Sequence, residues 1–433
     1  MQKRLGVDLR VLQIGHQFRG IGEHTKQLIS HFPSSPLFSE TEFVFYAYSD
    51  LDDPTTLIKS SLKQYPRFKV EKVGPAPPPL ASTVSNYVRR IRYDQTYEYE
   101  NRLASADVDA MLFIDFNLGV PATARYHKTL IMYDLIPFLF PNQYHPTYKQ
   151  GRRQGAGVRA AGTDAYRNRL YSQALSRATA HADQILAISH HTKSDLVREL
   201  GLDASKIIAI ALGVEPAPVQ TVRGVDIAAR TASNAETTLR PTDESFVFYM
   251  GGSDFRRRVS HLFEAFEQAK KTNADLKLVL AGADFTHRTA VPERSFRQAL
   301  ASSDYADDIF FLGYISDAER ALLYQQALAF VYPTLYEGFG LPILEAMAFG
   351  CPVITYANSS TTEVGGDAAL FATDVGHIAD LIERLARDAQ LVKQLRVKGL
   401  EQIRAFTWEE TADKTLSAIV RPPSLSSLIP TPS

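Results

Sequence analysis

The sequence contains a single cysteine, Cys351, and no run of about 20 apolar residues. One thiol excludes an intrachain disulfide framework and a cysteine-based metal site, and its apolar surroundings predict a small core residue. Without a long apolar run, no membrane-spanning helix is expected. The formal net charge is only −1, so no overall field draws the chain to nucleic acid or to a membrane surface.

The first residues also lack the pattern of a secretion signal. The basic start is followed by apolar positions that Asp8 and Arg10 interrupt, whereas a signal peptide has an unbroken apolar core. We therefore expect a cytoplasmic protein that binds no nucleic acid.

What the sequence does contain is enough chain for more than one core. With 433 residues, two domains are expected. Strand-like and helix-like segments alternate in both halves, which predicts α/β domains with mostly parallel sheets, over 1–213 and 245–406. Residues 214–244 are polar without a clear period and are interpreted as a linker. A last helix is predicted over 407–420, and the Pro/Ser-rich segment 421–433 is expected to be disordered.

The most informative stretch is Tyr336–Met347, which lies between two strand-like runs. Gly338 and Gly340 allow the backbone to approach a ligand closely, and the helix that follows presents free N–H groups to an anion. Glu337 and Glu345 flank this anion site. Because carboxylates repel phosphate, they are better suited to accept hydrogen bonds from hydroxyls. A ligand with phosphates in its middle and hydroxyls at both ends is a sugar nucleotide.

Each glutamate taken alone has a simpler interpretation, a turn cap for Glu337 and a solvated helix face for Glu345. The whole pattern Glu-Gly-Phe-Gly-Leu-Pro-x-x-Glu-Ala-Met, however, resembles the signature of the family 4 retaining glycosyltransferases. The resemblance implies the GT-B fold, with two Rossmann-like domains facing each other across a cleft. It also implies an acceptor-side N-terminal domain, a donor-binding C-terminal domain, and a last helix that returns to the N-terminal domain.

The resemblance assigns roles within this stretch. In the family, the first Glu and the Gly-Phe-Gly backbone hold the donor sugar, the next amides hold the diphosphate, and the second Glu holds the ribose. The positions that correspond are Glu337, Gly338, Phe339, Gly340, Leu341 and Glu345.

A second strand-turn-helix unit, beginning at Ser245, carries three adjacent arginines. By itself, such a turn is most often a solvated surface. It resembles the family turn Gly-Gly-x-Asp-x-Arg-Lys-Asn, which starts here one residue before Gly252 and whose Arg and Lys bind the donor diphosphate. Arg256 matches the Arg, Arg257 replaces the Lys, and Arg258 stands where Asn is usual.

In the N-terminal half, the loop ending in Gly22 resembles the first loop of the family, which lies near the donor phosphates and the acceptor. The next residues are Glu23 and His24, where the family usually has Arg and Tyr. Gly22 is therefore a candidate donor-binding residue.

The strand-like run from Lys128 ends in Tyr133 and Asp134, and such strand ends point into the ligand crevice of parallel sheets. The family commonly has His near the donor sugar where this chain has Tyr133. A phenol still hydrogen-bonds a sugar hydroxyl, or Tyr133 is only a strand-end aromatic. Asp134 either positions hydroxyls or caps the following turn.

These assignments predict a reaction without a metal ion. Negative charge develops on the leaving diphosphate, and Arg256, Arg257 and the helix start near Leu341 are placed to stabilise it. By resemblance, the anomeric configuration is retained, with Glu337 against the sugar. Two Asp-x-Asp pairs, 50–52 and 107–109, have the spacing of a metal site, but we interpret both as structural. No cofactor and no metal is expected.

The donor is the least determined part. The run Met132–Pro137 looks like the mannosyltransferase branch, which makes GDP-mannose the first choice. UDP-glucose, UDP-N-acetylglucosamine and UDP-galactose stay open. An epimerase would need a set of acid/base residues, and the sequence shows no evident one. The alternative from another functional class is a non-catalytic nucleotide-sugar-binding protein.

For the acceptor, we expect a glycan or a lipid-linked acceptor. Basic residues alternate with aromatics over Tyr87–Tyr93, which suits an acidic or lipid-linked partner and peripheral contact with the inner face of the membrane. The plainer interpretation of this segment is a solvated amphipathic helix.

Overall fold

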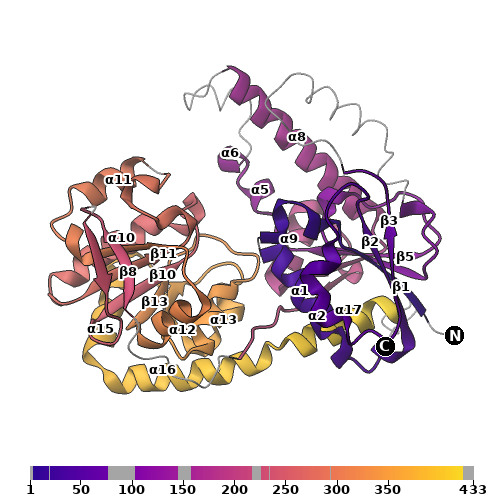
Figure 1. The fold of residues 1–433 in the computed structure, drawn as a ribbon. Helices are drawn as coiled ribbons and strands as arrows, with labels where there is room; N and C mark the ends of the chain where they lie inside the picture. The colour runs from indigo at the N-terminus through magenta and orange to yellow at the C-terminus, as the bar shows by residue number, and fades with distance from the viewer. Residues whose placement is uncertain are drawn as a thin grey trace, which may run out of the picture. The chain divides into compact units, whose positions relative to one another are not determined.

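The computed structural model describes residues 3–18, 20–76, 103–144, 158–216, 226–233, 235–292 and 294–422. The chain divides into two compact units (Figure 1). Unit 1 comprises Met1–Gly213 together with Trp408–Ser433, and unit 2 comprises Val214–Thr407.

Unit 1 is built on a seven-stranded parallel sheet with the order β3-β2-β1-β4-β5-β6-β7. Its central strands are apolar runs because both faces of a parallel sheet are covered. The strands are β1 (Lys3–Asp8), β2 (Thr41–Ala47), β3 (Phe68–Lys72), β4 (Ala110–Phe113), β5 (His127–Met132), β6 (Gln184–Ala187) and β7 (Ile207–Ala209). The helices are α1 (Gly20–His31), α2 (Lys59–Leu62), α5 (Ile136–Leu139), α6 (Pro141–Tyr144), α8 (Val158–His181), α9 (His190–Leu200) and α17 (Trp408–Val420).

Unit 2 has an eight-stranded sheet with the order β15-β14-β13-β10-β11-β12-β8-β9. Six of the strands run parallel, and β8 and β9 are antiparallel additions at one edge. The strands are β8 (Ile227–Thr231), β9 (Glu236–Leu239), β10 (Phe246–Met250), β11 (Lys277–Ala281), β12 (Ile309–Gly313), β13 (Ala329–Tyr332), β14 (Val353–Tyr356) and β15 (Ala369–Ala372). The helices are α10 (Val259–Lys270), α11 (Arg294–Ala301), α12 (Asp317–Gln326), α13 (Leu341–Ala348), α14 (Thr361–Gly365), α15 (Val375–Arg387) and α16 (Ala389–Gln402). Two Rossmann-like domains were predicted, and this prediction is confirmed.

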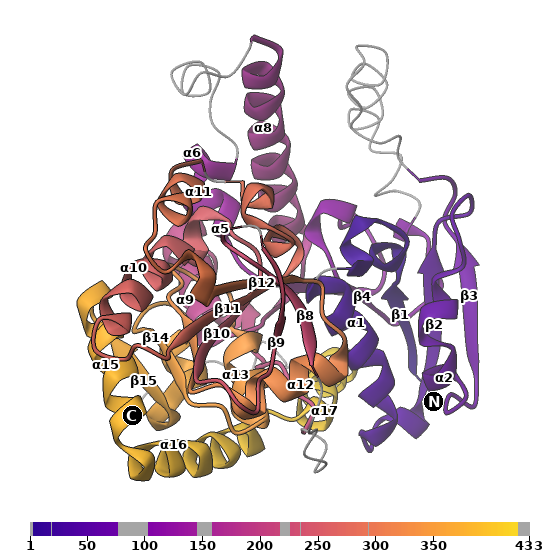
Figure 2. The same cartoon turned by 60° about the vertical axis from the view of Figure 1, so that its left-hand side comes forward.

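The linker prediction for 214–244 is wrong over the hairpin. Strands β8 and β9 pair with each other and extend the sheet beyond β12 (Figure 2). Ile227 faces Leu239 in the register, and both side chains are buried, while the positions between them are mostly half-exposed or exposed. An edge hairpin that buries so few apolar side chains has no strong apolar pattern in the sequence.

The predicted return of the last helix to the first domain is confirmed. Helix α17 belongs to unit 1, where it packs on α1 (Figure 1). The indole of Trp408 stacks on His31, and Asp413 accepts a hydrogen bond from Ser35 at 2.6 Å. Thr411 also donates to the carbonyl of Ala211 at 2.8 Å, two residues before the chain leaves unit 1 at Gly213.

The start of α12 and the single cysteine are two further local features. Ser316 begins α12 with a capping box, because its hydroxyl accepts from the backbone of Glu319 while the Glu319 carboxylate accepts from the backbone of Ser316. Cys351 is buried, and burial raises the pKa of its thiol to about 12, as expected for a core residue. Among the described helices, none is both long and apolar enough to cross a membrane.

The ends of β10 and β11 approach each other through glycine. Gly282 has φ 133°, and a Cβ there would lie 2.1 Å from the carbonyl oxygen of Gly251. A backbone oxygen cannot move aside without shifting the strand end. We therefore expect Gly282→Ala to lower the free energy of unfolding by about 3 kcal/mol or more, from the clash and the backbone strain together.

The matched control is Gly350→Ala. Gly350 also has a positive φ, 70°, but a Cβ there meets nothing within 4 Å, so only the left-handed conformation costs energy, about 1 kcal/mol. Urea unfolding of both variants checks the prediction. Equal losses of stability would contradict it.

Candidate active site

The candidate site of unit 2 lies at the carboxyl edge of its parallel strands. Neighbouring strands β10, β13 and β14 are followed by the turn 251–258, the loop 333–340 and the loop 357–360. Because the carboxyl ends of parallel strands share one edge of the sheet, these three loops are brought together. This is where ligands bind in open α/β sheets.

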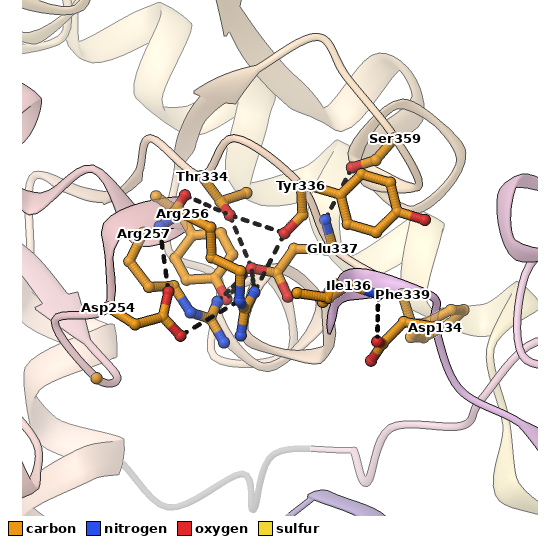
Figure 3. Close-up of polar contacts among 12 residues, drawn as sticks. Asp134, Ile136, Asp254, Arg256, Arg257, Thr334, Tyr336, Glu337, Phe339 and Ser359 are labelled. Carbon is orange, nitrogen blue, oxygen red and sulfur yellow. Dashed lines mark hydrogen bonds and ion pairs between the residues drawn. The ribbon is translucent and has the colours of Figure 1, made fainter. Parts of the chain in front are cut away.

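Glu337 is the centre of this site (Figure 3). Its Oε1 accepts from Arg256 Nη1 at 2.6 Å and from Arg257 Nη1 at 2.5 Å. The same oxygen accepts from the Thr334 hydroxyl at 2.8 Å and the Tyr332 hydroxyl at 3.1 Å. The side chains of Glu337 and the two arginines are each less than one-fifth exposed. One buried carboxylate therefore orders two guanidinium groups.

The arginines are also held by contacts that do not involve Glu337. Arg256 donates from Nη1 to the carbonyl of Tyr336 at 3.1 Å, and its Nε lies 3.3 Å from the Asp254 carboxylate. The backbone oxygen of Arg256 accepts from the N–H of Leu335 at 2.6 Å. The Arg257 guanidinium lies over the ring of Tyr332, 4.9 Å from its centroid. Both cations are therefore preorganised by their surroundings.

The loop after β14 fixes the backbone around Glu337. The N–H of Glu337 donates to the Ser359 hydroxyl at 3.0 Å (Figure 3). Ser360 donates to the carbonyls of Glu337 and Phe339, at 2.9 and 2.6 Å. Asn358 donates to the carbonyl of Thr334 at 2.8 Å.

Sequence reasoning missed these supporting residues. The sequence did carry a signal for them, because a polar run of six residues begins at Asn358, two residues after a buried strand. At such a position, hydroxyl and amide side chains hydrogen-bond backbone groups of neighbouring loops.

The remaining predicted residues of unit 2 lie around this core. Gly340 has φ 108° and begins α13, the helix whose free N–H groups were predicted to face an anion. Leu341 and Glu345 are half-buried on that helix. The side chain of Phe339 is 3% exposed and meets Phe406 edge to face, so it packs in the core and leaves only its backbone for a ligand.

In the turn 251–258, Gly252 and Arg258 have different roles. The carbonyl of Gly252 accepts from the Tyr249 hydroxyl at 2.5 Å, which fixes the turn. Arg258 has φ 46° and begins α10, and its guanidinium lies over Tyr356, 5.7 Å from the ring centroid. Unlike Arg256 and Arg257, Arg258 therefore contacts Tyr356 and not Glu337.

In unit 1, the predicted residues make internal contacts. A Cβ on Gly22 would lie 2.5 Å from the carbonyl oxygen of His16, so glycine is needed there for close backbone packing. Asp134 accepts from the N–H of Ile136 at 2.8 Å (Figure 3). Of the two roles expected for Asp134, this contact is the one that caps the following turn.

The Tyr133 hydroxyl is bonded to Nδ1 of His24 at 2.6 Å. His24 is 3% exposed and packs between the rings of Tyr133 and Trp408. Burial lowers the pKa of His24 to about 3 and raises the pKa of Tyr133 well above its usual value. Both groups are therefore neutral at pH 7, and the pair ties α1 to the end of β5.

The two Asp-x-Asp pairs make structural contacts: 107–109 precede β4, and 50–52 lie in the turn after β2. Asp107 pairs with Arg4, and Asp109 accepts from the N–H of Arg4 at 2.8 Å, just before β4 begins. Asp50 accepts from the N–H of Ala76 at 2.6 Å. Among the described residues, no group of three or more His, Cys, Asp or Glu side chains is placed to hold a metal ion. The segment Tyr87–Tyr93 and most of the predicted tail lie outside the described residues.

The buried imidazole predicts a pH dependence of stability. Folded His24 stays neutral down to a pKa of about 3, whereas the unfolded side chain takes up a proton below about 6.5. The unfolded state therefore binds more protons between these values, and stability falls as the pH drops from 6.5 toward 3. The loss is at most about 1.4 kcal/mol per pH unit for one proton.

His24→Asn supplies the matched control, because its amide keeps a polar group near Nδ1 and does not titrate. Urea unfolding at pH 7, 6, 5 and 4 should show a steeper loss for the wild type than for the variant. Parallel curves would mean that His24 is not neutral in the folded protein.

Comparisons with known proteins agree with this geometry. The sequence profile of the family described as "Glycosyl transferases group 1" matches residues 231–402. The chain is 29% identical over 261 residues to O-antigen chain mannosyltransferase B of Escherichia coli, covering 58% of this chain and 64% of that protein. It is 25% identical over 312 residues to the serotype-specific mannosyltransferase WbdA of Escherichia coli, covering 71% of this chain but only 35% of that protein.

Solved structures share the fold at low identity. Anabaena Alr3699/HepE, crystallised with UDP and glucose, has a TM-score of 0.61 at 15% identity and covers 97% of this chain and 100% of its own. WaaG, a glycosyltransferase involved in lipopolysaccharide biosynthesis, has a TM-score of 0.58 at 14% identity, with 96% and 100% covered. Residues 231–402 therefore belong to the group 1 glycosyltransferases, in a chain that has the GT-B fold and mannosyltransferases among its relatives.

Proposed function

We propose that this protein is a retaining hexosyltransferase that moves mannose from GDP-mannose to a glycan or lipid-linked acceptor. The observation that carries the proposal is the pair of arginines held on buried Glu337, in the two loops that match the glycosyltransferase motifs. A site with two ordered guanidinium groups beside a helix N-terminus suits the diphosphate of a sugar nucleotide.

The proposed chemistry is transfer of the sugar with departure of the nucleoside diphosphate. The bond between the anomeric carbon and the diphosphate oxygen breaks, and the acceptor oxygen bonds to that carbon on the same face. The leaving phosphate takes the acceptor proton. Arg256 and Arg257 stabilise the negative charge on the leaving group, an effect worth about 3 kcal/mol for one preorganised donor. Glu337 lies on the sugar side, where positive charge develops.

Relatives support mannose as the transferred sugar. Two relatives from Escherichia coli, at 29% and 25% identity, are mannosyltransferases. HepE was crystallised with UDP and glucose, but at 15% identity that likeness speaks for the fold alone. UDP-linked glucose, galactose or N-acetylglucosamine is therefore the second choice, and the O-antigen relatives favour a polysaccharide acceptor.

Donor screening tests the proposal directly. GDP-mannose should raise the melting temperature more than UDP sugars at equal concentration, because the tighter ligand stabilises the folded state more. Slow hydrolysis to free mannose, with the first-formed anomer identified by NMR, should show retention. Binding without any turnover would instead support a non-catalytic nucleotide-sugar-binding protein, and inversion would exclude the retaining mechanism.

The arginine roles give a matched pair of variants. Arg257→Asn removes a cation from Glu337 and should lower kcat by about 100-fold. Arg258→Asn removes the neighbouring cation, which lies over Tyr356 instead, and asparagine tolerates its left-handed backbone. Its activity should stay within about threefold of the wild type. Similar losses in both variants would show that only the overall charge of the turn matters.

Metal independence is the next expected outcome. Fixed guanidinium groups are proposed to do what a divalent cation does for a leaving diphosphate. Turnover in excess EDTA should equal turnover with Mg²⁺. A tenfold drop in EDTA, or about 1.4 kcal/mol of barrier, would overturn the metal-free mechanism.

A further inference from the structure

Glu337 faces the two cations that the proposed diphosphate site would use. Its Oε1 is the shared acceptor of Arg256 Nη1 and Arg257 Nη1, at 2.6 and 2.5 Å. The three charges together amount to +1, where the two arginines alone would present +2. The carboxylate is only 7% exposed, so its charge is poorly screened by solvent.

The arginines do not depend on this carboxylate alone for their positions. Arg256 is also bonded to the Tyr336 carbonyl and lies near Asp254, and Arg257 is stacked on Tyr332. Replacing the carboxylate with a neutral group of the same shape should therefore leave both cations in the site. What changes is the charge that they present to an anion.

We propose that Glu337 is an internal counter-anion of the diphosphate site, which neutralises one of the two arginine charges and so weakens the binding of the diphosphate product. The inference rests on the proposed function and adds a second role for Glu337 beside its contact with the sugar. A guanidinium has five N–H donors, and the hydrogen bond from Arg257 to Glu337 uses Nη1. The site then orders its cations without holding the leaving group too tightly to release it.

The two possible roles of Glu337 toward the arginines predict opposite results. If the carboxylate mainly lowers the positive charge, its removal strengthens anion binding. If it mainly holds the arginines in place, its removal weakens anion binding. A charge within about 4–6 Å of an ionisable group shifts its equilibrium by roughly tenfold or more, so either effect is measurable.

The experiment is a charge cycle read with inorganic pyrophosphate by calorimetry. The formal charge of the cluster is +1 in the wild type, +2 in Glu337→Gln, 0 in Arg257→Gln, and +1 in the double variant. The proposal predicts that Glu337→Gln binds pyrophosphate most tightly and Arg257→Gln most weakly. The wild type and the double variant should lie together between them. Glu337→Gln should bind about tenfold tighter than the wild type, or about 1.4 kcal/mol.

Asp254→Asn is the matched control. It removes a carboxylate that also lies beside Arg256, but this side chain is 43% exposed, and asparagine replaces aspartate well at a helix N-cap. Solvent screens an exposed charge, so pyrophosphate affinity should change by less than about threefold. Melting temperatures of all variants show that each is folded under the conditions used.

The outcomes separate the inference from the proposed function. Equal or weaker pyrophosphate binding by folded Glu337→Gln overturns the counter-anion role. If Glu337→Gln does not fold, the double variant binding no better than Arg257→Gln overturns it equally. Repeating the titrations with GDP and UDP tests the donor class: if neither nucleotide binds any protein while the pyrophosphate order holds, the proposed function fails and the counter-anion role stands.

Discussion

The candidate site depends on the hydrogen bonds between one buried carboxylate and two guanidinium groups. Glu337 comes from the loop after β13 and the arginines from the turn after β10, and these strands are neighbours in the sheet. Serines from the loop after β14 then hold the backbone on either side of the carboxylate. The contacts of Glu337 therefore join the loops of three adjacent strands at a single edge. Positioning of this kind is what transfer from a diphosphate needs, because the protein acts mainly by orienting and stabilising charge.

Burying three charges is costly unless each is satisfied by partners. The cost is offset here because Oε1 takes four donors, two of them neutral hydroxyls, and because an aromatic face covers one guanidinium. The same arrangement determines the chemistry that the site can do. A net charge of +1 attracts an anion, but it binds that anion less tightly than two uncompensated cations would. Order and moderate attraction thus come from the same carboxylate.

In unit 1, the predicted site residues have a mainly structural role. Side chains that the sequence suggested for ligand contact mostly bond within the unit, as when Tyr133 meets His24 and Asp134 caps the turn before α5. Trp408, the first residue of the returning helix, packs on the same imidazole. The end of β5, the start of α1 and the start of α17 therefore form one packed cluster. Its neutral, buried groups stabilise the frame of the domain instead of supplying charge to a ligand.

The sequence alone determined the features that repeat locally. Alternating apolar strands and helices predicted two parallel-sheet domains, and the Glu337 stretch and the arginine turn predicted the fold family. Only the tertiary structure decided that Glu337 bonds both arginines, since 80 and 81 residues separate these partners along the chain. It likewise decided that Ser359 and Ser360 support the loop, and that β8 and β9 form an edge hairpin. Local pattern records which face of an element is apolar. It does not record which polar side chains meet when loops from separate strands converge.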